Sequence, residues 1–217
     1  MSSRVAALIA AAGTGDRLGL GPKALVTVGG RTLLDLALEA LVPLVDEIVV
    51  AVPADAVDHW PTRPGVTLVA GGGTRQASVL AMLAATTAEH VLVHDVARPF
   101  LPGEVVARVL AAARRHGAAT AAVGIADTVV TGDGAEVDRS ELRAVQTPQG
   151  FARELLSAAH ESARAAGHAA TDDAGLVRRL GRRVELVEGS PLLFKVTRPE
   201  DLQLAEALAA RLPTGAR

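Results

Sequence analysis

Two cations in a glycine-rich loop near the N-terminus could bind phosphate groups. The stretch LIAAAGTGDRLGLGPKALV, residues 8–26, starts as an apolar strand and continues into a loop that carries Arg17 and Lys23. Glycines let a backbone approach a ligand closely and point N–H groups at it. A guanidinium can donate to two phosphate oxygens at once, and an ammonium adds a compact point charge. The loop therefore predicts a site for a polyphosphate.

This loop matches neither of two widespread phosphate-binding motifs. The dinucleotide motif requires GxGxxG at the start of a helix, but Leu18 occupies the third glycine position and Pro22 breaks the helix. The P-loop motif requires Ser or Thr directly after its lysine, and here alanine follows Lys23. A polyphosphate lying along a loop fits these residues better than a pyrophosphate on a helix N-terminus.

A carboxylate at the end of an apolar run is the candidate metal ligand. Asp95 closes the run HVLVHD, residues 90–95, and should lie at the carboxyl edge of a sheet, where open α/β folds bind ligands. Mg²⁺ is held there by one or two carboxylates, by water and by substrate phosphates. The alternative is a structural Asp95, solvated or paired with Arg98, while His94 is interpreted as a structural strand residue.

Short apolar runs alternate along the chain with segments whose apolar spacing is near 3.6 residues. This alternation predicts an α/β fold, with a Rossmann-like, mostly parallel sheet and helices on both faces. Asp172 and Asp173 fall in the first turn of one expected helix and are interpreted as charges that favour the helix dipole. We expect strands at 4–10, 47–52, 66–70, 90–95, 118–123 and 183–188, and helices at 32–41, 74–86, 102–116, 152–167, 171–180 and 202–210.

The alternation lapses between about residues 125 and 150. The triplet GDG, residues 132–134, is a hairpin signal between two β-prone pieces. We therefore expect a β-arm that leaves the sheet of a single domain, residues 1–217.

Composition excludes several classes of protein. A net charge of −2 argues against a broad nucleic-acid or membrane surface. The absence of cysteine excludes disulfides and thiolate metal sites. No apolar stretch approaches the roughly 20 residues that cross a bilayer. We expect a cytoplasmic protein without nucleic-acid or membrane partners.

A series of motifs resembles those of the 2-C-methyl-D-erythritol 4-phosphate cytidylyltransferases, which are nucleotide-sugar pyrophosphorylase-like nucleotidyltransferases. The resemblance covers nearly the whole chain, and the motifs follow one another in order. They are AAAGTGDRLGLGPKAL (10–25), GGGTRQASV (71–79), HDVARP (94–99), DTV (127–129), VDR (137–139), TPQGF (147–151), TDDA (171–174) and KVTRPEDL (195–202).

The resemblance implies an enzyme that joins CTP to 2-C-methyl-D-erythritol 4-phosphate and releases pyrophosphate. It further implies Mg²⁺ or another divalent cation, and a homodimer whose arm reaches into the neighbouring subunit's site. It assigns catalysis to Arg17, Lys23 and Lys195, nucleotide binding to Ala11, Ala12, Gly13, Gly72, Gly73 and Ser78, substrate binding to Arg98, Thr128, Arg139 and Lys195, and the metal to Asp95.

Three positions depart from the family pattern, and three other functions stay open. Gly73 stands where many members carry an acidic residue, and Leu192 and Leu193 stand where relatives have Asp and Asn. One alternative is a cytidylyltransferase for ribitol 5-phosphate, which shares most of these motifs. The second is a nicotinamide oxidoreductase, against which the proline-broken loop speaks. The third is a nucleotide-binding module without activity.

Overall fold

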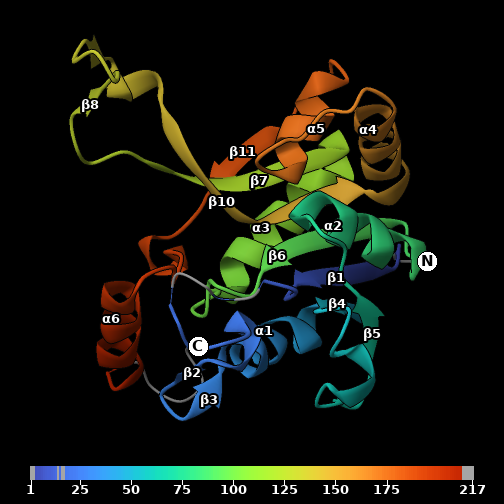
Figure 1. Cartoon of the computed structure of the whole chain (residues 1–217). Coiled ribbons are helices and arrows are strands. Elements are labelled where there is room, and N and C mark those ends of the chain that lie inside the picture. The colour runs from blue at the N-terminus through green and yellow to red at the C-terminus, as the bar shows by residue number, and fades with distance from the viewer. Residues whose placement is uncertain (1–2, 14, 16–17, 212–217) are drawn as a thin grey trace.

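The strands of the central sheet form where the sequence places apolar runs. A computed structural model describes residues 3–13, 15 and 18–211, and within them it confirms the expected α/β fold (Figure 1). All strands of the seven-stranded sheet run parallel except β10. In sheet order they are β11 (Glu185–Glu188), β7 (Ala118–Gly124), β10 (Arg143–Ala152), β6 (His90–Asp95), β1 (Val5–Ala10), β4 (Glu47–Val52) and β5 (Val66–Ala70).

Helices cover both faces of this sheet, as expected. Side chains alternate between the faces of a strand, and in β1 Ile9 packs into one apolar cluster while Leu8 packs into the other. Both clusters are buried, which explains why the strand is apolar throughout. The first face carries α1 (Leu33–Leu41), α3 (Gly103–His116) and α6 (Pro199–Ala209), and the second carries α2 (Arg75–Ala84), α4 (Arg153–Ala165) and α5 (Asp173–Arg179).

The order of the strands creates a crevice beside β1. The chain leaves β1 through α1 to β4 on one side, and later returns as β6 on the other side. The carboxyl ends of β1 and β6 lie next to each other, since Ala10 is in register with Asp95. Such a reversal of strand order is where open α/β sheets bind ligands.

Side chains cap the two helices that begin near this crevice. Thr74 Oγ1 accepts a hydrogen bond from the backbone N–H of Ala77 (3.1 Å) at the start of α2. Asp172 Oδ1 accepts from the backbone N–H of Gly175 (2.8 Å) at the start of α5. Each bond satisfies a backbone donor that has no partner within its helix.

The segment between β7 and β10 projects from the body of the protein (Figure 1). It contains the two-stranded hairpin β8 (Val129–Val130) and β9 (Glu136–Val137), so the hairpin signal in GDG is confirmed. The backbone N–H of Thr131 donates to Ala135 O (2.8 Å) and closes the turn.

The projecting segment ends earlier than the sequence pattern indicates, because residues 143–150 belong to β10 in the central sheet. This strand shows no apolar alternation, since its buried side chains include Gln146 and Gln149. Their partners come from elsewhere in the chain. Gln146 Nε2 donates to Ser190 O (2.8 Å), and Gln149 Nε2 donates to Asp172 Oδ2 (2.8 Å).

The remaining elements are short. β2 (Thr27–Val28) and β3 (Arg31–Thr32) form a small hairpin beside α6. Single turns of 3₁₀ helix lie at Lys23–Leu25, Val42–Leu44, Val57–His59, Arg139–Glu141 and Pro191–Leu193. Among the residues that the structure describes, no helix is both long and apolar enough to span a bilayer.

Candidate active site

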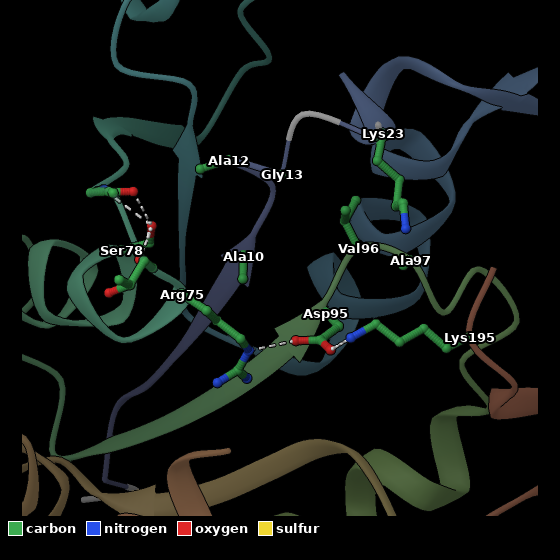
Figure 2. A pocket seen from close by; sticks show the side chains of 14 residues that line it. Ala10, Ala12, Gly13, Lys23, Arg75, Ser78, Asp95, Val96, Ala97 and Lys195 are labelled. Carbon is green, nitrogen blue, oxygen red and sulfur yellow. Dashed lines mark hydrogen bonds and ion pairs between the residues drawn. The ribbon is translucent and has the colours of Figure 1, made fainter. Parts of the chain in front are cut away.

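A cavity of about 500 Å³ opens at the carboxyl ends of β1 and β6 (Figure 2). Two glycine-rich loops, the start of α2, the end of β6 and one lysine from the C-terminal region line it. Its described lining residues are Ala10, Ala12, Gly13, Gly15, Lys23, Gly72, Gly73, Thr74, Arg75, Ser78, Asp95, Val96, Ala97 and Lys195. The structure thus gathers most of the predicted nucleotide-binding and catalytic residues around one cavity. Ala11 is buried beside them, and Arg17 lies outside the described residues.

The first loop folds back on itself around Gly13 and Gly15. The backbone N–H of Lys23 donates to Gly13 O (3.2 Å), and the N–H of Leu18 donates to Gly15 O (2.8 Å). These bonds bring Lys23 to the cavity, where its Nζ donates to Val196 O (3.0 Å) in the segment that also supplies Lys195. Backbone hydrogen bonds therefore close the loop that is predicted to bind a polyphosphate, and Lys23, at the C-terminal end of this loop, lines the cavity.

Replacing Gly15 with Ala is expected to weaken nucleotide binding at least about tenfold, as judged by calorimetry with CTP, the nucleotide implied by the motifs. Gly15 has φ +76°, and a Cβ there would lie 2.1 Å from the carbonyl oxygen of Gly21. The loop would have to open, which removes the pre-formed cradle for phosphates.

Gly19→Ala is the matched control for this substitution. Gly19 also has positive φ (+68°), but a Cβ there meets nothing within 4 Å. Both variants therefore carry the cost of a left-handed alanine, about 1–2 kcal/mol, and only Gly15→Ala adds the clash. Equal losses of CTP affinity in the two variants would contradict the proposed cradle.

The second loop, residues 71–74, is held by Ser78. Ser78 Oγ accepts from the backbone N–H of Gly72 (3.1 Å) and donates to Thr74 O (3.0 Å). This side chain is only 3% exposed, so in the structure its hydroxyl stabilises the loop. Contacts of Ser78 with a base or ribose stay a prediction.

The two glycines predicted to bind nucleotide differ in the space around them. A Cβ on Gly72 would lie 2.4 Å from that of Ala77, whereas a Cβ on Gly73 meets nothing within 4 Å. Gly72 is therefore required by packing, and position 73 can accept a side chain. The acidic residue that the resemblance implies at position 73 in many family members would therefore fit this backbone without a clash at its Cβ.

Asp95 is held between two cations at the floor of the cavity (Figure 2). Its Oδ1 accepts from Arg75 Nε (2.9 Å) and its Oδ2 from Lys195 Nζ (2.6 Å). Burial by itself would raise the pKa of Asp95, but the charges of Arg75 and Lys195 outweigh it and hold this pKa well below its usual range. The carboxylate is therefore ionised, and its partners are Arg75 and Lys195 instead of Arg98, the partner considered from the sequence.

A chain of hydrogen bonds behind β6 orients the backbone of Asp95. Its N–H donates to Thr147 Oγ1 (3.1 Å), which lies 3.2 Å from Nδ1 of His94, while Nε2 of His94 lies 3.2 Å from Arg98 O. A carbonyl oxygen only accepts, so Nε2 carries the proton and Nδ1 accepts from the threonine. Burial lowers the pKa of His94 to about 4, which keeps this ring neutral. His94 is thus the structural residue that the sequence indicated.

A second, smaller cavity of about 220 Å³ adjoins the first. The two cavities share Arg75, Asp95 and Lys195, and the second adds polar side chains from β10 and the start of α5. Its described lining residues are Arg75, Asp95, Arg98, Val145, Gln146, Thr147, Gln149, Thr171, Asp172 and Lys195.

The predicted substrate-binding residue Arg98 lies in this second cavity. Its guanidinium donates to the carbonyl oxygen of Leu193. Leu193 is buried in the apolar core and Leu192 packs against it, so the two departures from the family pattern fill core positions in this chain. Burial lowers the pKa of Arg98 below its ordinary value, although Asp95 opposes that effect.

Thr128 and Arg139 lie apart from both cavities, on the projecting arm (Figure 1). They line a polar cavity of about 960 Å³ within the arm, between residues 124 and 143. Arg139 donates to the carbonyl oxygen of Ala126. Within one chain, the structure therefore does not bring these two predicted substrate-binding residues to Asp95.

No cluster of three or more metal-ligating His, Cys, Asp or Glu side chains occurs in the described part of the chain. Asp95 is the one predicted metal ligand, and it lines the cavity with its two carboxylate oxygens bound to Arg75 and Lys195. A single carboxylate suits Mg²⁺, which takes its other ligands from water and substrate phosphates.

Arg75 and its contact with Asp173 were not identified from the sequence. The sequence did contain a signal for Arg75, because a cation that begins a helix just after the glycine-rich loop 71–74 is well placed to face a ligand. Asp173 does lie in the first turn of α5, as interpreted from the sequence. It is also 1% exposed, and its Oδ2 accepts from Arg75 Nη1 (2.6 Å). Thr147 and Thr171, which line the second cavity, were also not identified.

Comparison with known proteins identifies the family of this chain. A family model described as 2-C-methyl-D-erythritol 4-phosphate cytidylyltransferase matches residues 5–211. A protein of that name from Deinococcus radiodurans is 54% identical, over 99% of this chain and 93% of its own length. Another, from Thermus thermophilus, is 51% identical over 94% of this chain and 97% of its own length.

Solved structures lead to the same family. The crystal structure of the enzyme of that name from Thermus thermophilus matches with a TM-score of 0.87 and 48% identity, and it covers 97% of this chain and 100% of that one. The corresponding structure from Francisella tularensis matches with a TM-score of 0.80 and 27% identity, over 94% of this chain and 99% of that one. The predicted resemblance is confirmed, and the chain belongs to the 2-C-methyl-D-erythritol 4-phosphate cytidylyltransferase family.

Proposed function

We propose that this protein transfers the cytidylyl group of CTP to the phosphate of 2-C-methyl-D-erythritol 4-phosphate. The products are 4-diphosphocytidyl-2-C-methyl-D-erythritol and pyrophosphate. The observation that carries the proposal, beside family membership, is that two cavities meet at Arg75, Asp95 and Lys195. A donor in one cavity and an acceptor in the other would have their phosphates next to each other at this shared wall.

The larger cavity suits the donor nucleotide. Its two glycine-rich loops allow close approach of a base and a triphosphate to backbone N–H groups. Lys23 stands on the wall formed by the first loop, where its ammonium can stabilise the negative charge that grows on the phosphates during transfer. Arg17 belongs to the same loop in sequence, and we keep it as a second proposed cation.

The smaller cavity suits the acceptor. Arg98 and Lys195 supply positive charge for a phosphate, and the hydroxyls of Thr147 and Thr171 can hydrogen-bond to a polyol. Lys195 also contacts Asp95, so it lies at the junction where the new bond would form.

The reaction requires no catalytic base. A phosphate oxygen of the acceptor, already an anion, forms a bond to the α-phosphorus of CTP, and the bond from that phosphorus to the bridging oxygen of the β-phosphate breaks. Pyrophosphate carries away the electron pair, and no proton is transferred. The task of the protein is to align two anions and to neutralise their charge, which suits a site built from cations and backbone N–H groups.

A divalent metal ion is part of this proposal, with Asp95 as its ligand from the protein. Such an ion, when bound, would neutralise phosphate charge and orient the triphosphate. Both carboxylate oxygens of Asp95 contact cations in the structure. Lys195 is the partner that can leave, because its side chain is 40% exposed and long enough to turn toward a phosphate.

We also propose a homodimer in which the arm of one subunit completes the acceptor site of the other. The arm projects from the body, and its predicted phosphate-binding residues Thr128 and Arg139 lie away from the cavities of their own chain (Figure 1). Since CTP is the donor, the enzyme would act in the cytoplasm, where nucleoside triphosphates are available.

Arg139→Ala is expected to raise the KM for 2-C-methyl-D-erythritol 4-phosphate at least about tenfold, with the KM for CTP changed less than about threefold. A guanidinium bound to a phosphate contributes roughly 1.5–3 kcal/mol, and this one would contact the acceptor only. Steady-state kinetics with each substrate varied in turn measures the split. Arg143→Ala, in the same arm cavity, is the matched control. Equal rises of both KM values in Arg139→Ala would contradict the assignment.

Turnover with a panel of substrates tests the function itself. CTP, UTP, ATP and GTP are each supplied with Mg²⁺ and with either 2-C-methyl-D-erythritol 4-phosphate or ribitol 5-phosphate, and pyrophosphate release is measured. We expect the highest kcat/KM for CTP with the methylerythritol phosphate. Faster reaction with ribitol 5-phosphate, or CTP binding without any turnover, would reject the proposal in favour of the corresponding alternative.

A further inference from the structure

Arg75 joins two carboxylates that come from different parts of the fold. It is the first residue of α2, and its Nε donates to Asp95 at the end of β6 (2.9 Å). Its Nη1 donates to Asp173 at the start of α5 (2.6 Å). Figure 2 shows the guanidinium inside the cavity, facing Asp95. The side chain thus stands at the wall between the two cavities, with a second carboxylate behind it.

Asp173 holds Arg75 from outside both cavities. It is 1% exposed and lines neither cavity, so it does not face substrate. Its Oδ2 accepts from Arg75, and its Oδ1 lies 2.9 Å from Nε2 of the fully buried His160 on α4. A carboxylate bound on both oxygens cannot rotate freely, so it fixes the plane of the guanidinium that it holds.

The third nitrogen of the guanidinium, Nη2, is buried and has no hydrogen-bond partner among residues 3–13, 15 and 18–211. Buried polar groups without a partner are uncommon and costly. Burial opposes the positive charge of Arg75, but Asp173 and Asp95 outweigh it and raise its pKa, so the group is a permanent cation. Arg75 lines both cavities. An unpaired N–H donor on this fixed cation, at the wall that the two cavities share, is matched to a phosphate oxygen.

We propose that Arg75 is a further substrate-contacting residue, which donates from Nη2 to a phosphate oxygen of bound CTP, and that Asp173 and His160 are its positioning residues. This inference rests on the proposed function of the cavity. Asp173 keeps Arg75 in place even when the oxygens of Asp95 take other partners, because the two carboxylates bind different nitrogens of the guanidinium. A lysine could not do the same, since one ammonium lacks the planar fork that reaches three partners in fixed directions.

The test begins with Arg75→Lys, which keeps the charge but removes the fork. We expect CTP to bind at least about tenfold more weakly to this variant in EDTA, by calorimetry, and kcat with Mg²⁺ to fall about 100-fold, the usual scale for a pre-organised donor. Arg178→Lys, on the exposed side of α5, is the matched control and should change neither value. Unchanged CTP affinity and kcat in Arg75→Lys would overturn the proposal.

Chemical rescue separates contact with substrate from a merely structural role. Low millimolar guanidinium chloride is expected to raise the turnover rate of Arg75→Ala at least about tenfold. Sodium chloride at equal concentration should not raise this rate. Folded Arg75→Ala that guanidinium does not rescue would overturn the contact. If this variant does not fold, Arg75→Lys alone decides, because it retains the charge between the two carboxylates.

The positioning residues are tested through His160. His160→Leu removes the donor to Asp173 and should lower kcat/KM for CTP about tenfold, while His160→Gln, which retains an N–H donor, should stay within about threefold of wild type. In the Arg75→Lys background, His160→Leu should add no further loss, because both changes act through one contact. Losses that multiply, or a fully active His160→Leu, would overturn the positioning role.

These outcomes are distinguishable from failure of the proposed function. Wild-type protein without turnover of CTP and 2-C-methyl-D-erythritol 4-phosphate would reject the function. The affinity for CTP in EDTA would still be measured in every variant, and an unchanged affinity in Arg75→Lys would still reject the contact between Arg75 and the nucleotide.

Discussion

Replacing Asp95 with Asn is expected to reduce turnover by at least about 10³-fold and, at the same time, to strengthen binding of CTP in the absence of metal. The carboxylate is the proposed metal ligand, and removal of a pre-organised electrostatic partner commonly costs 10²–10³-fold in rate. In EDTA, however, the same change removes one negative charge that lies between Arg75 and Lys195. The cavity then carries one more net positive charge, and a triphosphate should bind several-fold more tightly.

Opposite effects on binding and turnover are difficult to obtain from simple misfolding. Calorimetry with CTP in EDTA and steady-state kinetics with Mg²⁺ measure the two effects, and thermal unfolding checks that the variant is folded. Asp58→Asn is the matched control, because Asp58 is exposed in the 3₁₀ turn Val57–His59 and lines neither of the two cavities. Turnover of Asp95→Asn within about threefold of wild type would remove Asp95 from the proposed mechanism.

Replacing Lys23 with Ala is expected to leave the fold intact and to lower kcat by about 10²–10³-fold. Lys23 is half-buried on the cavity wall, and its ammonium contacts the backbone of Val196. Its charge is placed where negative charge grows on the leaving pyrophosphate, and no other described lysine except Lys195 lines this cavity. Circular dichroism and thermal unfolding establish the fold, and single-turnover kinetics isolate the chemical step.

The composition of the chain allows a second measurement on Lys23. Lys23 and Lys195 are the only lysines in the sequence, so an amine-reactive reagent reports on these two side chains and the N-terminus. CTP is expected to protect Lys23 from acetylation, as followed by mass spectrometry. Arg182→Ala, which removes an exposed cation, is the control for the kinetic effect. Lys23→Ala with ordinary kcat would refute the role of this residue.

The fold could be predicted from the sequence because its information is local. Each of the parallel strands β1, β4 and β6 buries both faces and is therefore rich in apolar residues, and the helices between them carry apolar stripes. β10 escaped prediction for the opposite reason. Its buried Gln146 and Gln149 are satisfied by partners 44 and 23 residues away, so its polar sequence resembles a loop.

The candidate site could be predicted as far as individual positions. Asp95 was identifiable because a carboxylate that closes an apolar strand lies at the ligand-binding edge of an open α/β sheet. Lys23 and the glycines were identifiable because their types and spacing within one loop suit phosphate. The separation of Thr128 and Arg139 from Asp95 within one chain was visible only in three dimensions, where the arm leaves the sheet (Figure 1).

The amino-acid pattern by itself determined the α/β class, the family and the position of the loop that is predicted to bind phosphate, since these depend on residues that are neighbours along the chain. Only the tertiary structure decided which charges pair. Arg75 contacts Asp95 and Asp173, 20 and 98 residues away, and Lys195 contacts Asp95 across 100 residues. Such pairs arise from the order of strands in the sheet and from the placement of α2 and α5 on its face. No local periodicity records that arrangement, because the same runs and stripes would suit other strand orders equally well.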